Sequence, residues 1–226
     1  MSGAGVPDFF FREAKRLNFV ARSAFKLLEI QKKYGIITRG AAVLDLGCAP
    51  GAWLQVACQS LGPLAKGGAV VGVDIKKVKV PSHHCDERVQ TLSADVLKVD
   101  PRDLAKRSPG GLGFSVILSD MCPSVSGISS RDAALSVELG MCTLNLAFSD
   151  NPGEPPPENN ILPVPTSKEG LLIPGGSVVI KLLEGEDSRE LLQLCKSRFK
   201  TTTWFRPKAT RPTSREIYLI GKGRTL

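Results

Sequence analysis

Hydrophobic residues follow two patterns along the chain. Short runs rich in Val, Ile and Leu predict buried strands, and longer segments in which apolar residues recur every three or four positions predict helices. The expected strands cover residues 41–45, 69–74, 89–92, 114–119, 178–182, 201–205 and 216–220. The expected helices cover residues 18–33, 52–61, 102–106, 131–148 and 187–197. Strands and helices therefore alternate along most of the sequence.

This alternation predicts an α/β fold of the Rossmann-like class, in which a mostly parallel sheet carries helices on both faces. Only a short segment separates the last two predicted strands, so we expect an antiparallel edge. The 226 residues, 42% of them hydrophobic, suffice for one substantial core, and we expect a single domain over residues 1–226. Residues 149–169, rich in Pro, Asn and acidic residues, are expected to form a mobile insertion in that domain.

The segment "VLDLGCAPGAW", residues 43–53, reads as a strand, a glycine turn and the start of a helix. Gly47 and Gly51 allow the backbone to turn sharply and a ligand to approach closely. The spacing is neither GxGxxG nor GxxxxGK[ST], so it does not indicate a dinucleotide or triphosphate site. Asp45 leads into the turn instead, which suits a ligand with a cationic part.

Two further acids, Asp74 and Asp95, follow the next two predicted strands. A carboxylate about twenty residues beyond a glycine turn commonly binds ribose hydroxyls, and one at the following strand could accept from an adenine amino group. S-adenosylmethionine fits this pocket better than NAD, because its ammonium and sulfonium charges match acidic surroundings and it has no pyrophosphate. The alternative is that these aspartates only cap turns and helices.

A lysine, Lys181, interrupts the apolar run "VVIKLL" at the carboxyl end of a predicted strand. Asp120 ends the strand at 114–119 and belongs to the same rim, and Lys26 and Glu216 are candidates to join them. Two lysines and two carboxylates can share a pocket at near-zero net charge. Burial and a neighbouring ammonium lower the pKa of a lysine, whereas nearby carboxylates raise it, and the sequence does not give the balance. Because Lys181 has the most apolar setting, we expect it to act as the base in its neutral amine form. The alternative is a lysine whose stem lies on the strand and whose ammonium reaches water.

These motifs together resemble those of the FtsJ/RrmJ family of ribose 2′-O-methyltransferases, and the likeness is greatest to its plant-type branch. The resemblance spans nearly the whole chain. Cys122 and Ser124 depart from it, because many members have Ala and Asn there. The segments that carry the resemblance are "RSAFKL", "DLGCAPGAW", "SDMCPSVSG", "VVIKLLEG" and "PKATRPTSREIY".

The resemblance implies a catalytic tetrad of Lys26, Asp120, Lys181 and Glu216, with Lys181 as general base. It also implies that S-adenosyl-L-methionine is the cofactor. The residues expected to bind it, from the motifs and the resemblance together, are Asp45, Gly47, Pro50, Gly51, Trp53, Asp74, Asp95 and Asp120.

The expected reaction is methyl transfer from this cofactor to a ribose 2′-hydroxyl of RNA, with ribosomal RNA as the leading substrate. Transfer RNA and the ribose of the messenger RNA cap are alternative substrates. A non-catalytic RNA-binding factor for ribosome assembly is an alternative of another class, and methylation of a protein or small molecule is a third.

Charge supports a polyanionic partner, since 30 Lys and Arg residues exceed 22 Asp and Glu residues and give a net charge of +8. Nucleic acid is favoured over an anionic membrane surface. Residues 196–215 contain seven basic residues and no acid, and Arg12, Lys15, Arg16 and Arg22 are expected to extend this RNA surface. Trp204 and Phe205 could stack on bases, although core packing is favoured.

The six cysteines form no CxxC pair, which indicates reduced thiols and an intracellular protein. We expect the cytoplasm, or a mitochondrion or plastid if a transit peptide has been removed. No membrane partner is expected, because the sequence has no apolar run of about eighteen residues. His83, His84 and Cys85 lack a fourth ligand at regular spacing, so no metal site is expected. We expect a monomer.

Overall fold

The computed structural model describes residues 8–124, 126–148, 170–185 and 188–225. Within these ranges the helices are α1 (Phe9–Arg16), α2 (Ala24–Tyr34), α3 (Ala52–Ser60), α4 (Pro101–Ala105), α5 (Ser129–Phe148) and α6 (Ser188–Arg198). The strands are β1 (Ala42–Leu46), β2 (Ala69–Asp74), β3 (Val89–Ser93), β4 (Phe114–Ser119), β5 (Leu172–Leu183), β6 (Phe199–Phe205) and β7 (Glu216–Arg224). The expected insertion at 149–169 lies outside the described residues.

The seven strands form one sheet in the order β3-β2-β1-β4-β5-β7-β6. Neighbours from β3 to β5 are parallel, whereas β7 runs antiparallel to both β5 and β6. The predicted α/β fold with a mostly parallel sheet and an antiparallel edge is therefore confirmed. The antiparallel strand is one position inside the edge, because β7 inserts between β5 and β6.

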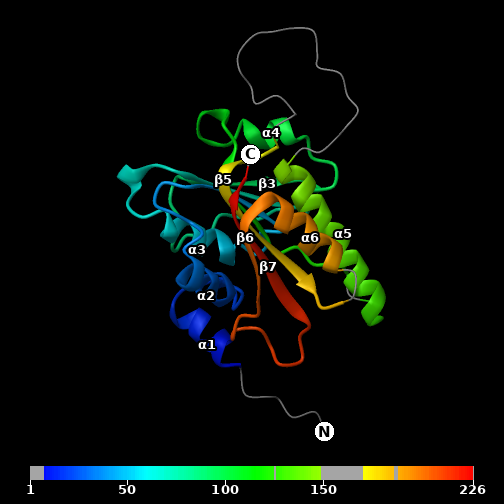
Figure 1. Ribbon diagram of the computed structural model, residues 1–226. Helices are drawn as coiled ribbons and strands as arrows, with labels where there is room; N and C mark the ends of the chain where they lie inside the picture. The colour runs from blue at the N-terminus through cyan, green and yellow to red at the C-terminus, as the bar shows by residue number, and fades with distance from the viewer. Residues whose placement is uncertain (1–7, 125, 149–169, 186–187, 226) are drawn as a thin grey trace, which may run out of the picture.

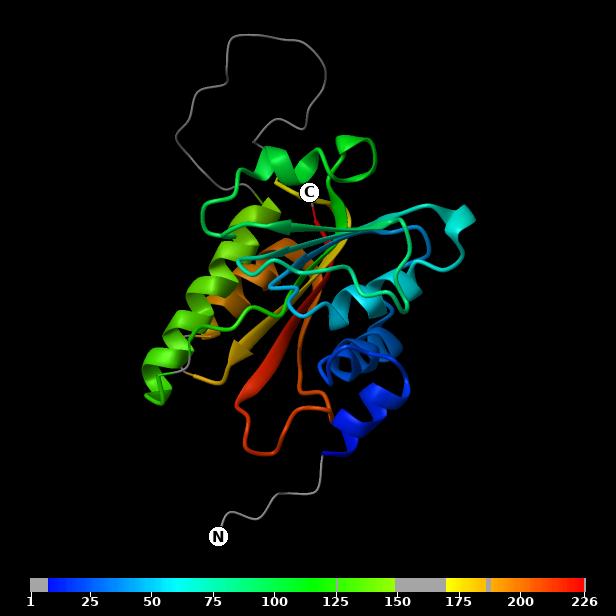
Figure 2. The same cartoon turned by 180° about the vertical axis from the view of Figure 1, so that it is seen from behind.

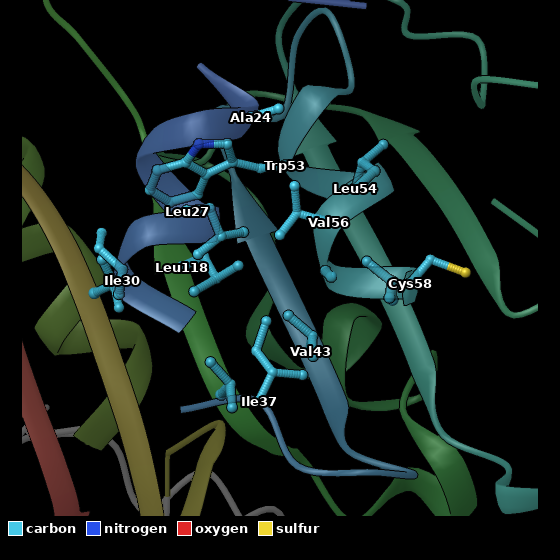
Figure 3. Packing of buried hydrophobic residues seen from close by; sticks show 14 of the residues in the cluster. Ala24, Leu27, Ile30, Ile37, Val43, Trp53, Leu54, Val56, Cys58 and Leu118 are labelled. Carbon is cyan, nitrogen blue, oxygen red and sulfur yellow. The ribbon is translucent and has the colours of Figure 1, made fainter. Parts of the chain in front are cut away.

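Helices cover both faces of the sheet, with α2 and α3 on one face and α5 and α6 on the other (Figures 1 and 2). Side chains alternate between these faces along each strand. Val43 and Leu118 pack beneath α2 and α3 (Figure 3), whereas Leu44 and Ile117 face the other core. This two-residue period decides which polar side chains at the strand ends can meet.

The N-terminal region differs from the single helix predicted at 18–33. It contains two helices, α1 and α2, and Asn18 between them has a positive φ of 59° that breaks the helix. The side chain of Asp8 caps α1 by accepting a hydrogen bond of 2.9 Å from the Phe10 amide. Sequence periodicity missed α1 because only Ala14 of this helix is buried.

Several predicted boundaries shift by small amounts, and β5 is the main exception, because it begins six residues before the predicted strand at 178. Its pairing with β4 contains an irregularity between Phe114 and Val116, so the early part of β5 lacks a regular register. None of the helices in the described parts of the chain is long and apolar enough to cross a membrane.

Candidate active site

The glycine turn joins β1 to α3 and leaves no room for larger residues. Gly47 and Gly51 have φ angles of 77° and 109°. A Cβ at Gly47 would lie 2.9 Å from the backbone nitrogen of Met121, and one at Gly51 would lie 2.9 Å from Cγ of Pro81. Pro50 follows a cis peptide bond with Ala49 in the same turn. The turn is thus closely packed around the carboxyl end of β1.

Asp74 and Asp95 lie at the carboxyl side of β2 and β3, as predicted. Asp74 accepts hydrogen bonds of 2.9 Å from the Ala49 amide and 2.8 Å from the Lys76 amide, and so ties the glycine turn to β2. Asp95 accepts a hydrogen bond of 3.0 Å from the Leu97 amide. Each carboxylate oxygen has two lone pairs, so both residues retain the capacity to accept from a hydroxyl or an amine.

Asp45 is fully buried, and neither of its carboxylate oxygens has a hydrogen-bond partner among the described residues. Burial raises its pKa well above the ordinary value, and the nearby charges of Asp120 and Asp74 raise it further. Burial therefore favours the neutral form of this side chain. A carboxyl group of this kind beside the glycine turn is suited to a cationic ligand group, whose charge would offset the cost of ionising it.

Trp53 is 2% exposed and connects α3 to the segment before α2. Its indole nitrogen donates a hydrogen bond of 2.9 Å to the Ser23 carbonyl. Its ring centroid lies 5.8 Å from that of Tyr218. The indole is part of the core, so the backbone of Trp53, rather than its side chain, is available to a ligand. Its role as a cofactor residue stays a prediction.

The four residues of the predicted tetrad form two ion pairs. Nζ of Lys181 lies 3.0 Å from Oδ1 of Asp120, and it also donates to the Asp120 carbonyl. Nζ of Lys26 lies 2.5 Å from Oε2 of Glu216. Both lysines are buried, at 7% exposure for Lys181 and 8% for Lys26. The structure therefore brings together residues from α2, β5, β7 and the end of β4.

The two-residue period explains why these side chains meet. Val43, Leu118 and Val179 all point toward the core beneath α2 and α3. Asp45, Asp120 and Lys181 each follow one of them by two positions, so they lie on the same face at the carboxyl ends of β1, β4 and β5. Lys26 reaches this rim from α2, which covers that face.

Electrostatics in the tetrad favours a charged Lys181 and a charged Glu216. Burial alone would lower the pKa of Lys181, but the charges of Asp120, Cys122 and Glu216 outweigh it and leave the pKa above the ordinary value. Burial would likewise raise the pKa of Glu216, yet Lys26 outweighs it and leaves that pKa lowered. A lysine whose pKa lies above its ordinary value is an ammonium near neutral pH, which differs from the neutral amine expected from sequence.

Tyr218 is a member of the site that sequence reasoning missed. Its hydroxyl donates a hydrogen bond of 2.9 Å to Oδ1 of Asp120. It is fully buried on β7, where it stands opposite Lys181 in the register with β5. The signal was present, because Tyr218 follows Glu216 by two positions and therefore faces the same side of the sheet.

The remaining sequence candidates have structural roles. In the described part of the chain no group of three His, Cys, Asp or Glu side chains could hold a metal ion. His84 instead hydrogen-bonds the Leu17 carbonyl at 2.7 Å. All six cysteines are free thiols. Trp204 and Phe205 pack partly buried against the two cores, as the favoured interpretation predicted.

Residues 19–224 match the sequence pattern of the family described as FtsJ-like methyltransferase. The chain is 37% identical over 220 residues to the ribosomal RNA large subunit methyltransferase E of Desulfosudis oleivorans, covering 97% of this chain and 91% of that protein. It is 39% identical over 216 residues to the protein of the same name from Syntrophobacter fumaroxidans, covering 96% and 95%. A crystal structure of a Plasmodium falciparum protein assigned as a ribosomal RNA methyltransferase shares the fold, with a TM-score of 0.67, 22% identity, and coverage of 90% of this chain and 97% of that chain. The chain therefore belongs to the FtsJ-like methyltransferase family.

Proposed function

We propose that this protein transfers a methyl group from S-adenosyl-L-methionine to a ribose 2′-hydroxyl of RNA, and that the RNA is ribosomal. The observation that carries the proposal is the buried Lys181 amine, held by Asp120 at the carboxyl rim of the sheet that also bears the glycine turn. The names of the relatives from Desulfosudis and Syntrophobacter support ribosomal RNA as the substrate class.

The residues around the glycine turn fit the proposed cofactor. Asp45 has two buried oxygens without partners among the described residues, and these suit the amino group of the methionine part. Asp74 and Asp95 retain acceptor capacity for ribose hydroxyls and the adenine amino group. When bound, S-adenosylmethionine supplies an electrophilic methyl group on a sulfonium. Asp74 and Asp120 lie near enough to Asp45 to raise its pKa, and carboxyl groups gathered in this way complement a cationic ligand.

Lys181 would accept the hydroxyl proton at Nζ, and Asp120 would hold that amine in place. Because Lys181 carries a proton in the structure, it becomes a base only after that proton has left. The Lys26 and Glu216 pair would orient the hydroxyl from the other side. Alignment of reacting groups can contribute roughly 7 to 11 kcal/mol, and general base assistance about 10² to 10⁴ in rate.

RNA contact is proposed for the exposed cations near this rim. Lys208 and Arg211 lie on the loop between β6 and β7, and Arg12 and Lys15 are exposed on α1. Arg22 differs from them, since its side chain is only 16% exposed and pairs with Asp8. Arg22 therefore stabilises the protein through this ion pair, and we do not include it in the proposed RNA surface, although the sequence had placed it there.

The test is transfer of labelled methyl groups to an unmodified transcript of large-subunit ribosomal RNA, with wild type and Lys181→Ala. We expect transfer by the wild type and loss of at least about 10² in rate for the variant, with cofactor binding retained. Equal rates would show that Lys181 is not the base. Transfer RNA and capped messenger RNA serve as competing substrates, and methyl transfer that survives ribonuclease treatment of the acceptor would point to a protein or small molecule instead.

A further inference from the structure

The loop between β6 and β7, residues 206–215, turns twice before it delivers Glu216. The Thr210 amide donates a hydrogen bond of 2.9 Å to the Pro207 carbonyl, and the Ser214 amide donates one of 3.0 Å to the Arg211 carbonyl. The first turn is inserted into the protein, with its residues Pro207, Ala209 and Thr210 buried and Lys208 and Arg211 exposed. We call residues 207–211 the basic turn.

Glu29 on α2 holds the basic turn by its backbone. Its Oε2 accepts a hydrogen bond of 2.8 Å from the Lys208 amide, and its Oε1 accepts one of 2.8 Å from the Ala209 amide. Arg22 donates a hydrogen bond of 2.6 Å to the Ala209 carbonyl. Hydrogen bonds to a charged group are shorter and stronger than neutral ones. The carboxylate therefore fixes two successive peptide groups at once.

Helix α2 connects this clamp to the tetrad. Glu29 lies three residues after Lys26, so both project from the same side of the helix. Lys26 pairs with Glu216 at the end of the loop, and Glu29 binds the middle of the loop. In both views the loop lies at the end of the molecule that carries α1 and α2 (Figures 1 and 2). One helix thus sets the position of the basic turn relative to the tetrad.

The other cations of the loop are used internally. Arg206 donates to the carbonyls of Ser214 and Glu216. Arg215 donates to the carbonyls of Ser129 and Glu184. Lys208 and Arg211 differ, because among the described residues their side chains donate to no carbonyl of the loop. Arg211 is 67% exposed, and its Nε lies 3.8 Å from Oδ2 of Asp8. The loop therefore contains two arginines that hold its conformation, Arg206 and Arg215, and two cations that remain available to a partner, Lys208 and Arg211.

We propose that Glu29 is a positioning residue, which holds the basic turn in the conformation in which Lys208 and Arg211 bind phosphates of the RNA beside the tetrad. The inference rests on the proposed function and specifies how its substrate is held. Without the carboxylate, two backbone amides lose their acceptor and the turn samples many conformations. The two cations then contact the RNA backbone less often, although their charges are unchanged.

The expected direction of the change in RNA affinity makes Glu29→Gln a decisive test. Removing a negative charge should by itself strengthen RNA binding. Gln, however, keeps only one neutral oxygen for the two amides and turns an NH2 group toward the other, so the weakened clamp should lower RNA affinity. Glu13→Gln on α1 is the matched control, because it makes the same charge change at a partly exposed site where Glu13 pairs only with Arg16 among the described residues. For Glu29→Gln we expect KM for the ribosomal RNA transcript to rise about tenfold, with cofactor affinity unchanged and a smaller change in kcat. Glu13→Gln should leave KM equal or lower.

Salt dependence distinguishes positioning from a general loss of structure. Loss of two phosphate contacts should reduce the slope of log affinity against log salt by about 1.4 for single-stranded and about 1.8 for duplex sites. Lys208→Gln combined with Arg211→Gln leaves α2 intact and should give the same loss of slope. Adding Glu29→Gln to that pair should raise KM little further. If the increase in KM from Glu29→Gln were fully additive with the increase from the Lys208→Gln and Arg211→Gln pair, the proposal would be overturned. This holds even if Glu29→Gln alone folds poorly.

Two failures are distinguishable in this assay. Wild-type methyl transfer to RNA with an unchanged or lower KM for Glu29→Gln would overturn the role of Glu29 alone. Absence of methyl transfer to RNA by the wild type would overturn the proposed function and this inference with it.

Discussion

The phenol of Tyr218 and the carboxylate of Asp120 share a hydrogen bond of 2.9 Å at Oδ1, the same oxygen that lies 3.0 Å from Nζ of Lys181. One oxygen of a partly buried carboxylate thus receives a neutral donor on one side and an ammonium on the other. Both donors come from facing positions of β5 and β7. The tetrad is therefore supported by a fifth residue, which fixes the rotamer of Asp120.

Tyr218→Phe tests this support. The ring that packs on Trp53 remains, but Asp120 loses one donor, and a hydrogen bond to a charged group is worth about 1.5 to 3 kcal/mol. We expect kcat for methyl transfer to fall about tenfold or more, with the cofactor dissociation constant changed less. Tyr34→Phe, at the other of the two tyrosines, is the control and should leave kcat unchanged. Equal kcat for wild type and Tyr218→Phe would show that Asp120 needs no phenol.

The raised pKa of Lys181 predicts that methyl transfer accelerates with rising pH. The base form of a lysine becomes more abundant as the pH approaches its pKa, and the neighbouring carboxylates move that pKa upward against the effect of burial. Asp120→Asn removes the largest of these charges, so the rising limb of its pH–rate profile should shift to lower pH, although its maximal rate should fall. Single-turnover rates from about pH 6 to about pH 10 at saturating cofactor measure this. A rising limb at the same pH in both proteins contradicts the assignment.

Asp45→Asn should stabilise the protein without cofactor and weaken cofactor binding. The raised pKa of Asp45 means that its contribution to stability is complete below its unfolded pKa of about 3.9 and is lost as the pH rises toward the folded pKa. Asn does not ionise, so the melting temperature near neutral pH should rise by roughly 2 to 4 °C for each kcal/mol removed. Thermal unfolding against pH and equilibrium binding of the cofactor check both parts. An identical pH dependence for the two proteins would exclude a buried neutral Asp45.

Gly47→Ala should cost more stability than Gly35→Ala. Both glycines have a positive φ, at 77° and 56°, so both substitutions introduce backbone strain of about 1 to 2 kcal/mol. Only at Gly47 would the new Cβ approach a backbone nitrogen, that of Met121, to 2.9 Å, whereas nothing lies within 4 Å at Gly35. The alanine at 47 should also weaken cofactor binding, which the alanine at 35 should not. Equal losses of stability would mean that the turn can shift away from Met121.

The sequence pattern was sufficient to predict which residues share a face of the sheet, because this depends only on the two-residue period of a strand. The strands at 114–119 and 178–182 placed Asp120 and Lys181 on one rim, because every second residue of a strand shares a face and parallel strands end on the same side. The same period pointed to Tyr218. Helix α1 was missed because its exposed phenylalanines obscure the helical pattern, and most of its residues contact solvent.

Relationships between distant parts of the chain could not be predicted from sequence. The ion pair between Lys26 and Glu216 was not predicted, since nothing local connects these residues. The charge of Lys181 depends on its distance to Asp120, which periodicity does not contain. The two hydrogen bonds of Glu29 go to backbone amides, and backbone acceptance leaves no sequence motif of its own.

The insertion of β7 between β5 and β6 also has a consequence for biosynthesis. Glu216 and Tyr218 enter the rim on a strand that is translated after every other element of the sheet. Until β7 has been synthesised, Lys26 lacks its counterion Glu216. In the same interval β6 cannot join the sheet, because β7 is its neighbour there. A nascent chain that stops short of β7 therefore has a nearly complete scaffold but no assembled tetrad, so the proposed chemistry begins only once β7 has been made.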